Sequence, residues 1–370
     1  MMELALLGAA TAFAIAFLAG FLARRLAVQL GFVAVPRDDR HHRQPMPLLG
    51  GSAILAGILL PGALALALAA VWGATALPGW LPERLRLTLQ IHLPGILQRT
   101  PQALLILAGA VLLHVVGVID DRRRLGPWLK LAAQSAVAVA VVVLCPLRLL
   151  QFAGEPLSGI ATVLWIVLIT NAINFIDNVD GLAAGVTAIC SAALLAAAVA
   201  AGQLFVSAWL CLLLGASAGF LLHNFPPARL FMGDAGSLVL GYMLAVLTIL
   251  TTYYRPGSDG PGLYYSVFSP VVLLAVPLYD TFSVIVLRIR ARQSPMVGDT
   301  RHFSHRLLRR GMGPRKTVLT IYLATAATAA GASLLPHVTP TGAWIVFGQT
   351  AGIVLLIALL ESAEGRGRLP

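Results

Sequence analysis

Charged residues are scarce in this chain. Asp, Glu, Lys and Arg make up only 11% of its 370 residues, whereas about 25% is usual for a soluble domain. Cysteine is rarer still: Cys145, Cys190 and Cys211 lie in or beside apolar segments and lack metal-ligand spacing, so we expect neither disulfides nor a cysteine metal site. The longest stretches between apolar runs, residues 77–101 and 289–316, are too short for a separate domain of typical size.

Long apolar runs fill the chain instead. Hydrophobic residues make up 58% of it, and about 20 consecutive apolar residues span the hydrocarbon of a bilayer as a helix. The sequence therefore predicts an all-α polytopic integral membrane protein, with residues 1–370 forming one membrane domain of about eleven transmembrane helices. The predicted spans are residues 3–23, 50–76, 102–119, 130–149, 158–176, 182–201, 204–223, 236–253, 267–288, 317–336 and 343–360.

Basic residues are distributed unevenly between the segments that join these spans. None precedes the first apolar run and Arg24 and Arg25 follow it, which predicts an uncleaved first span with its N-terminus outside and a cytoplasmic C-terminus. In this orientation 21 Lys and Arg residues are cytoplasmic and 5 are not. The net charge of +11 is then mostly a topology signal, which favours the lipid bilayer as a partner over nucleic acid. The main predicted cytoplasmic loops are residues 24–49, 120–130, 177–181, 224–235 and 289–316.

Acidic residues collect on the same predicted face. Asp120 and Asp121 follow the third span, Asp177 and Asp180 the fifth, and Asp234 precedes the eighth. A single aspartate in a loop is most often a solvated charge, and DD before RRR is also a reasonable helix end. However, carboxylates from separate segments beside many arginines indicate a site for a divalent cation and a polyanion. The carboxylates of the adjacent Asp120 and Asp121 repel each other, and a bound Mg²⁺ would reduce that repulsion.

The segment NAINFIDNVDG, residues 171–181, is rich in polar groups although it ends an apolar run. Asn171, Asn174, Asp177 and Asp180 recur every three residues, so on a continuing helix they form one slowly drifting stripe. Lipid cannot satisfy such groups, and the stripe must face protein or water. Hydrogen bonding between helices could explain one asparagine, but four polar groups in register favour a functional surface.

Two further segments carry groups suited to phosphate near the predicted cytoplasmic face. Lys130 lies on a helix that Pro127 begins, where its ammonium either holds a phosphate or extends toward water. Gly233 and Ser237 flank Asp234 at the start of the eighth span, and backbone N–H groups at such a helix end favour an anion. Asp234 could also serve only as an N-cap.

The basic loop near residue 300 contains His302, His305 and Arg306. The spacing of the two histidines suits zinc as well as hydrogen bonds to phosphate. Phosphate is the better prediction, because no cysteine and no helical H-E-x-x-H motif supports zinc.

Taken in order along the chain, these motifs resemble those of the polyprenyl-phosphate N-acetylhexosamine-1-phosphate transferases. They are DD with a downstream P-x-x-K, N-A-x-N-x-x-D-x-x-D-G-L-A, G-D-x-G-S, and a histidine-containing loop that ends H-R-L-L. The resemblance covers residues 31–311 and includes a first cytoplasmic loop with Pro36, His42 and Pro47. Each motif is short and weakly specific alone, whereas their conjunction in one topology is specific.

The resemblance implies a reaction at the cytoplasmic face of a bacterial inner membrane. Undecaprenyl phosphate attacks the β-phosphorus of a UDP-sugar, giving a polyprenyl-pyrophosphate sugar and UMP, with Mg²⁺ or alternatively Mn²⁺ as cofactor. A homodimer is a further expectation. The implied catalytic residues are Asp120, Asp121 and Asp177, and the implied metal ligands are Asn174, Asp234, Asp120 and Asp121. The implied substrate-binding residues are Lys130, Asn171, Asp180, Gly233, Ser237, His302, His305, Arg306 and His42.

Three positions depart from the family pattern. Ala34 replaces an aspartate, Asn178 replaces a glycine, and Ser304 interrupts a run that often consists of histidines. We expect the first two to affect loop packing and the third to bear on the donor sugar. The H-F-S-H loop resembles the N-acetylglucosamine-1-phosphate branch, which starts envelope polymers such as O-antigen or teichoic acid linkage units. The alternative is the phospho-MurNAc-pentapeptide translocase of peptidoglycan synthesis.

Asp280 keeps two other classes open. It lies about 12 Å along a helix from Arg288, and an intramembrane acid is either functional or a buried hydrogen-bond partner. Tyr279-Asp280 and Gly233-Asp234 partly match an intramembrane aspartyl protease, although the glycine pattern is incomplete and the order is reversed. A secondary transporter would place its ionisable groups near the bilayer midplane. The segment 77–97 predicts either an amphipathic helix on the outer surface or an ordinary loop.

Overall fold

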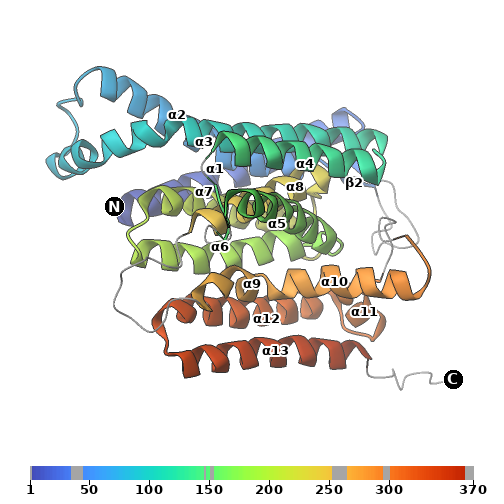
Figure 1. Ribbon diagram of the computed structural model, residues 1–370. Helices are drawn as coiled ribbons and strands as arrows, with labels where there is room; N and C mark the ends of the chain where they lie inside the picture. Colours follow the sequence, from blue (N-terminus) through green and yellow to red (C-terminus); the bar gives the residue numbers. More distant parts are fainter. Residues whose placement is uncertain are drawn as a thin grey trace.

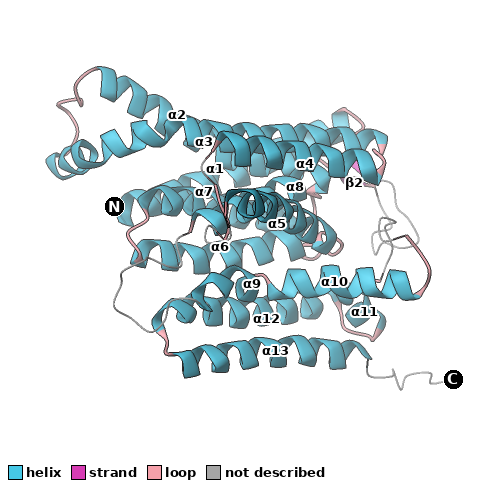
Figure 2. Ribbon diagram, in the orientation of Figure 1, coloured by secondary structure: helices cyan, strands magenta, loops and turns pink. Residues whose placement is uncertain are grey.

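Helices form almost all of the computed structural model, which describes residues 2–34, 45–145, 147–150, 154–251, 265–294 and 301–362. In Figure 2 the described chain is nearly all helix. The helices are α1 (Met2–Gln29), α2 (Gly50–Ala74), α3 (Glu83–Arg123), α4 (Pro127–Leu144), α5 (Glu155–Ile176), α6 (Leu182–Ala200), α7 (Leu204–Asn224), α8 (Gly233–Leu250), α9 (Ser269–Leu273), α10 (Ala275–Arg290), α11 (Phe303–Arg309), α12 (Pro314–Leu334) and α13 (Pro340–Ser362). Short 3-10 turns η2 (Tyr265–Phe268) and η3 (Leu335–His337) and two-residue strands β1 (Val33–Ala34) and β2 (Met46–Pro47) complete it.

The number of membrane-crossing helices agrees with the sequence. Within the described residues, ten helices are long and apolar enough to cross a membrane. The pair Tyr265–Leu273 and Ala275–Arg290, bent by 69°, supplies an eleventh as one broken span. In Figure 1, α1 begins and α13 ends at opposite ends of the bundle, as an odd number of crossings requires. The all-α class and the count of about eleven are therefore confirmed, and the bend is a feature that the predicted ninth span lacked.

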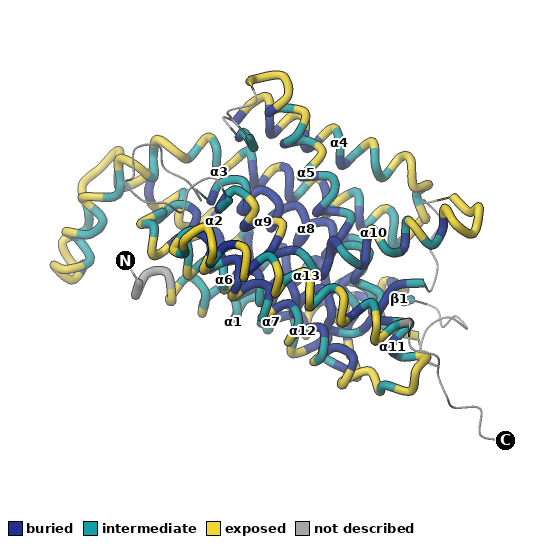
Figure 3. Tube along the Cα trace, turned by 60° about the horizontal axis from the view of Figure 1, so that its bottom comes forward, coloured by how far each residue is buried: buried dark blue, intermediate teal, exposed yellow. Residues whose placement is uncertain are grey.

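The centre of the bundle is α8. Of its residues 78% are buried, against 17% of the apolar stretch of α13. Figure 3 shows the same contrast as a continuous dark-blue interior around α8. In a protein surrounded by lipid, burial of this kind arises from close helix packing, because apolar side chains gain little by leaving lipid for protein.

Glycines let the neighbouring helices approach the backbone of α8. A Cβ atom added at Gly51 of α2 would lie 2.3 Å from the nitrogen of Gly236, and one at Gly117 of α3 would lie 2.4 Å from Cα of Ala235. Such distances require glycine, because no real Cβ approaches another atom so closely. The first turn of α8 is consequently held between α2 and α3.

The third span begins earlier than the sequence predicts. The helix α3 runs from Glu83 to Arg123 without interruption, a length of about 62 Å at about 1.5 Å per residue. That is roughly twice the thickness of the hydrocarbon. Its first half and the end of α2 project from the bundle at the left of Figure 1. The segment 77–97 is therefore helical from Glu83 onward, and the alternative of an ordinary loop is wrong for that part.

The two-residue strands β1 and β2 form a short antiparallel ladder beside the segment that precedes α8. Ala34 pairs with Met46 in this ladder. Phe231 N–H donates to the carbonyl oxygen of Pro47 at 2.8 Å, and Gly50 N–H donates back to the carbonyl oxygen of Phe231 at 2.9 Å. These hydrogen bonds hold the loop before α8 against the residues that lead into α2.

We expect Gly117→Ala to destabilise the protein by about 1–3 kcal/mol, since the added methyl group overpacks the contact with α8. The same change at Gly95 of α3, where an added Cβ meets nothing within 4 Å, should leave stability unchanged or raise it slightly. Thermal unfolding of the purified variants in detergent compares the two. Equal midpoints would contradict the close contact between α3 and α8.

Candidate functional site

Most of the predicted site residues that the structure describes gather at one end of the bundle. There α3, α5 and α10 end and α4 and α8 begin, at the right of Figure 1. We call this the site end. His42 lies outside the described residues.

The central contact at the site end is a lysine shared by two carboxylates. Lys130 Nζ lies 3.0 Å from Asp120 Oδ2 and forms a second, shorter ion pair with Asp234 Oδ2. Pro127 begins α4 in an ordinary N1 position, which places Lys130 in the first turns beside the end of α3. The side chains of Lys130, Asp120 and Asp234 are 19, 13 and 24% exposed, so water screens their attraction only in part.

An asparagine from α5 extends this contact. Asn174 Nδ2 donates to Asp234 Oδ1 at 3.1 Å and to Ser237 Oγ at 2.8 Å. The polar network of Asp120, Lys130, Asn174, Asp234 and Ser237 thus joins α3, α4, α5 and α8. We call these five residues the Lys130 network. The sequence named each of them as a site residue, and the structure brings them together.

Asp121, the neighbour of Asp120, caps α8. Its carboxylate accepts the backbone N–H groups of Asp234 at 2.9 Å and Ala235 at 3.2 Å. Gly233 has a φ of +66°, and a Cβ there would lie 2.4 Å from Asp121 Oδ2. The sequence predicted that backbone N–H groups at the start of α8 favour an anion. In the structure, those of Asp234 and Ala235 donate to the carboxylate of Asp121. A carboxylate at this position also interacts favourably with the helix dipole.

The remaining residues of the polar stripe have separate partners. Asn171 exchanges amide hydrogen bonds with Gln134 of α4, a contact between helices of the kind expected inside a membrane. Asp177 ends α5 as its C-cap. Asp180 Oδ2 accepts the backbone N–H of Ala228 at 2.9 Å, which fixes the turn after α5 to the segment between α7 and α8.

Asp280 anchors the histidine-containing helix α11. It is completely buried, and its two oxygens lie 2.7 Å from His302 Nδ1 and 2.8 Å from the backbone N–H of Phe303. The sequence left open whether this acid is functional or a hydrogen-bond partner, and in the structure it bonds to two groups at the start of α11. The Asp280 carboxylate thus accepts the first N–H of α11 and also orients the imidazole of His302. This imidazole packs edge-on against the ring of Phe175, with 5.8 Å between the ring centroids.

Arg306 is held by two helices. It pairs with Glu361 at 2.8 Å and donates to Ser283 Oγ at 2.9 Å. Tyr279 O–H donates to the other oxygen of Glu361 at 2.6 Å. The end of α13 therefore fixes α11, and sequence reasoning missed Glu361. The available signal was an acidic residue directly after the last apolar run. His305 follows Ser304 on α11 and is partly exposed.

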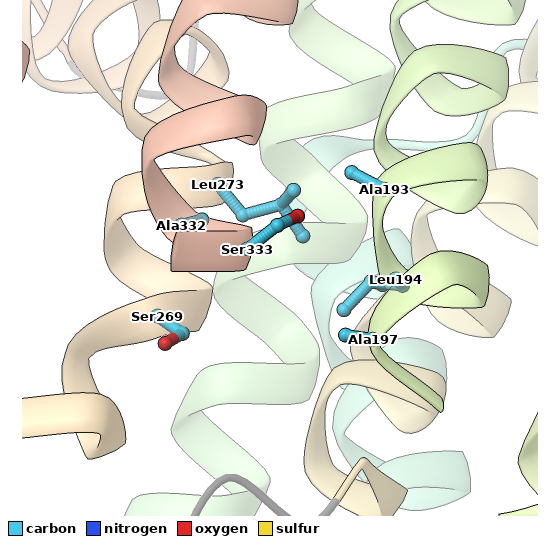
Figure 4. A pocket seen from close by; sticks show the side chains of 7 residues that line it. All are labelled: Ala193, Leu194, Ala197, Ser269, Leu273, Ala332 and Ser333. Atoms are coloured by element: carbon cyan, nitrogen blue, oxygen red, sulfur yellow. The ribbon is translucent and has the colours of Figure 1, made fainter. Parts of the chain in front are cut away.

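A pocket between α6, α9 and α12 is too small to be a substrate site. Its volume is about 10 Å³, roughly the room that one water molecule needs. Figure 4 shows its lining of short side chains such as Ala193, Ala197 and Ala332, with Ser269 and Ser333 as the polar groups. It is a packing gap away from the Lys130 network.

Ionisable groups kept inside a membrane bundle are costly, and they mark function by default. The partly buried network at the site end is therefore the candidate functional site of this membrane-spanning chain. The sequence profile of glycosyl transferase family 4 matches residues 103–252, from α3 to the end of α8. This range contains the whole Lys130 network.

Full-length relatives agree with this match. A Bacillus subtilis protein named "Probable undecaprenyl-phosphate N-acetylglucosaminyl 1-phosphate transferase" is 32% identical over 82% of this chain and 76% of its own. A Mycolicibacterium smegmatis decaprenyl-phosphate N-acetylglucosaminephosphotransferase is 32% identical over 97% of this chain and 88% of its own. A Yersinia pestis undecaprenyl-phosphate alpha-N-acetylglucosaminyl 1-phosphate transferase is 25% identical over 85% and 79%. The chain belongs to glycosyl transferase family 4, within the group of polyprenyl-phosphate N-acetylglucosamine-1-phosphate transferases.

We expect Asp280→Ala to loosen α11, because it leaves the Phe303 N–H and the His302 imidazole without their acceptor. Loss of a buried acceptor costs about 1–3 kcal/mol, so amide exchange in residues 303–309 should accelerate by roughly one to two orders of magnitude. Hydrogen exchange measured by mass spectrometry in detergent reports this.

Thr281→Ala is the matched control, because Thr281 is also buried but bonds only to Pro277 of its own helix among the contacts described. If exchange in α11 were the same in the two variants, Asp280 would not anchor this helix.

Proposed function

We propose that this chain transfers N-acetylglucosamine-1-phosphate from UDP-N-acetylglucosamine to a polyprenyl phosphate such as undecaprenyl phosphate. The product would be a polyprenyl-pyrophosphate sugar that begins a cell-envelope polysaccharide, and UMP would be released. The names of the relatives support the substrates. The observation that carries the proposal is the Lys130 network, a cation and two carboxylates within the region matched by the family.

The reaction joins two anions, and this determines what the protein must supply. An oxygen of the acceptor phosphate attacks the β-phosphorus, and the bond from that phosphorus to the bridging oxygen breaks, so that UMP leaves with the bridging oxygen. Positioning and neutralisation of charge account for most catalysis of phosphoryl transfer. Lys130 is a fixed cation at the site end, and its ammonium can hold a phosphate oxygen as a point charge.

The residues of the network fit Mg²⁺. Asp120 Oδ1 is buried and has no hydrogen-bond partner among the described residues, which is costly for a carboxylate oxygen unless a cation binds it. Asp120, Asp234 and Asn174 would hold the ion through hard oxygen atoms. In the described part of the chain no three His, Cys, Asp or Glu side chains form a metal cluster. Mg²⁺ is commonly bound by one or two carboxylates, with water and substrate phosphates completing its shell.

When bound, Mg²⁺ or Mn²⁺ would neutralise the pyrophosphate and make the β-phosphorus more electrophilic. The protein contributes the geometry. Asp121 holds the first turn of α8, and with it Asp234, by accepting the N–H groups of Asp234 and Ala235. Asp180 fixes the turn after Asp177. We assign His302, His305 and Arg306 to the side of the site that receives the pyrophosphate and sugar of the donor.

We place the site end at the cytoplasmic face of a bacterial inner membrane. The 21 to 5 distribution of basic residues supports this orientation, and α13 ends at the site end together with α10. The two aspartates considered for a protease have different partners: Asp234 bonds to Lys130 and Asn174, and Asp280 to His302 and Phe303. That arrangement gives no support to a paired aspartyl dyad.

A panel of donors tests the proposal. Purified protein with undecaprenyl phosphate and Mg²⁺ should release UMP and form the lipid product with UDP-N-acetylglucosamine. Turnover only with the muramoyl-pentapeptide donor would instead identify a peptidoglycan translocase. No turnover with any UDP-sugar, in protein whose thermal unfolding shows that it is folded, would overturn the transferase assignment.

Lys130→Gln should lower kcat by about 100-fold or more, because it removes a preorganised cation and leaves Asp120 and Asp234 facing each other. Lys130→Arg keeps the charge and should retain more activity. Lys316→Gln is the matched control, since Lys316 is an exposed cation in the first turn of α12. Steady-state kinetics with both substrates measure these effects. An equal, small loss in Lys130→Gln and Lys316→Gln would rule out the central role of Lys130.

A further inference from the structure

A buried serine links the histidine-containing helix to the polar turn after α5. Ser304 of α11 is completely buried, and its hydroxyl donates to Asn178 Oδ1 at 2.6 Å. The amide of Asn178 donates in turn to the carbonyl oxygen of Phe175 at 2.7 Å. One asparagine side chain thus connects the last turn of α5 with a helix more than a hundred residues further along the chain.

The two residues of this contact lie in two different parts of the predicted site. Asn178 lies between Asp177 and Asp180 in the turn after α5, four residues after Asn174 of the Lys130 network. Ser304 lies between His302 and His305. The hydrogen bond therefore sets the distance between the network side of the site and the histidine side.

Several contacts from different helices hold α11 in place. Asp280 holds the start of α11 from α10, and Glu361 holds Arg306 from α13. Both of these anchors come from the α10 and α13 side. Ser304 to Asn178 and the ring contact of His302 with Phe175 are the ones that draw α11 toward α5 among the contacts described.

Because Ser304 is buried away from water, its hydroxyl depends on Asn178 for a hydrogen bond. The loss of Asn178 leaves the hydroxyl of Ser304 without its hydrogen bond in a covered site, which is costly. A larger side chain at 304 has no room, because the serine is already fully covered.

We propose that the Ser304–Asn178 hydrogen bond is a positioning contact for the nucleotide-sugar donor. It keeps α11, with His302 and His305, at the separation from the 177–181 turn that fits the pyrophosphate and sugar. This inference rests on the proposed transferase function. We assign the acceptor phosphate to Lys130, whose described contacts with Asp120 and Asp234 include neither Ser304 nor Asn178.

The test is a double-mutant cycle in the transferase assay, with Ser304→Ala, Asn178→Ala and the double variant. Each single change should raise the KM for UDP-N-acetylglucosamine about tenfold, the loss expected for about 1.4 kcal/mol. The KM for undecaprenyl phosphate and kcat should change by less than about twofold. Because the two residues act through one bond, the double variant should resemble the single ones.

Binding of UDP-N-acetylglucosamine without acceptor, measured by calorimetry, should weaken by the same factor. Additive effects in the cycle, equal losses for donor and acceptor, or an unchanged donor KM would each overturn the proposal. Ser191→Ala is the control, since Ser191 is completely buried in α6 and its hydroxyl has no partner among the described residues. It should leave both KM values unchanged.

Wild-type protein in the same assay separates the two hypotheses. If the wild type is inactive with every donor, the proposed function fails and calorimetry alone decides whether the pair affects donor binding. If the wild type is active and the variants match it, only the positioning role fails. Thermal midpoints show whether each variant is folded, and Asn178→Ala, at a less buried position, carries the test should Ser304→Ala unfold.

Discussion

One ammonium group shared by two carboxylates is the interaction on which the site end depends. Lys130 brings Asp120 of α3 and Asp234 of α8 to one point, and without it the two acids would repel each other in a poorly screened place. The glycine contact between α3 and the first turn of α8, and the cap that Asp121 gives that turn, are the means by which the backbones come close enough. Close helix packing and ion pairing therefore both hold α3 and α8 together at the site end.

The second part of the site is the helix α11, which residues outside the Lys130 network hold in place. The helix α11 takes its position from Asp280, Asn178 and Glu361, which belong to three different segments. A transferase that joins two phosphates benefits from this division. We propose that the Lys130 network neutralises charge while α11 contacts the sugar, and among the described residues the Ser304–Asn178 hydrogen bond connects the two parts. Asp120 Oδ1, which has no hydrogen-bond partner among the described residues, belongs to the Lys130 network.

Local patterns in the sequence predicted much of this, and tertiary contacts explain what they missed. Apolar run lengths predicted the spans, because the bilayer sets a fixed length. The spacing of Asn171, Asn174, Asp177 and Asp180 predicted one stripe on a continuing helix, but α5 ends at Ile176 and only the two asparagines lie on it. A helix within residues 77–97 was one of two alternatives, but its continuity with the third span as one helix from Glu83 to Arg123 was not predicted. The partners of Asp121, Asp280 and Arg306 come from distant segments, and no local pattern identifies them.

The central claim is that a sugar phosphate, and not a sugar, moves to the lipid. UDP-N-acetylglucosamine labelled with ³²P in its β-phosphate distinguishes the two directly. If the account is correct, incubation with purified protein, undecaprenyl phosphate and Mg²⁺ will transfer the label to the lipid and release unlabelled UMP. Labelled UDP together with an unlabelled glycolipid would contradict it, because the bond broken would then be the one between the sugar and its phosphate.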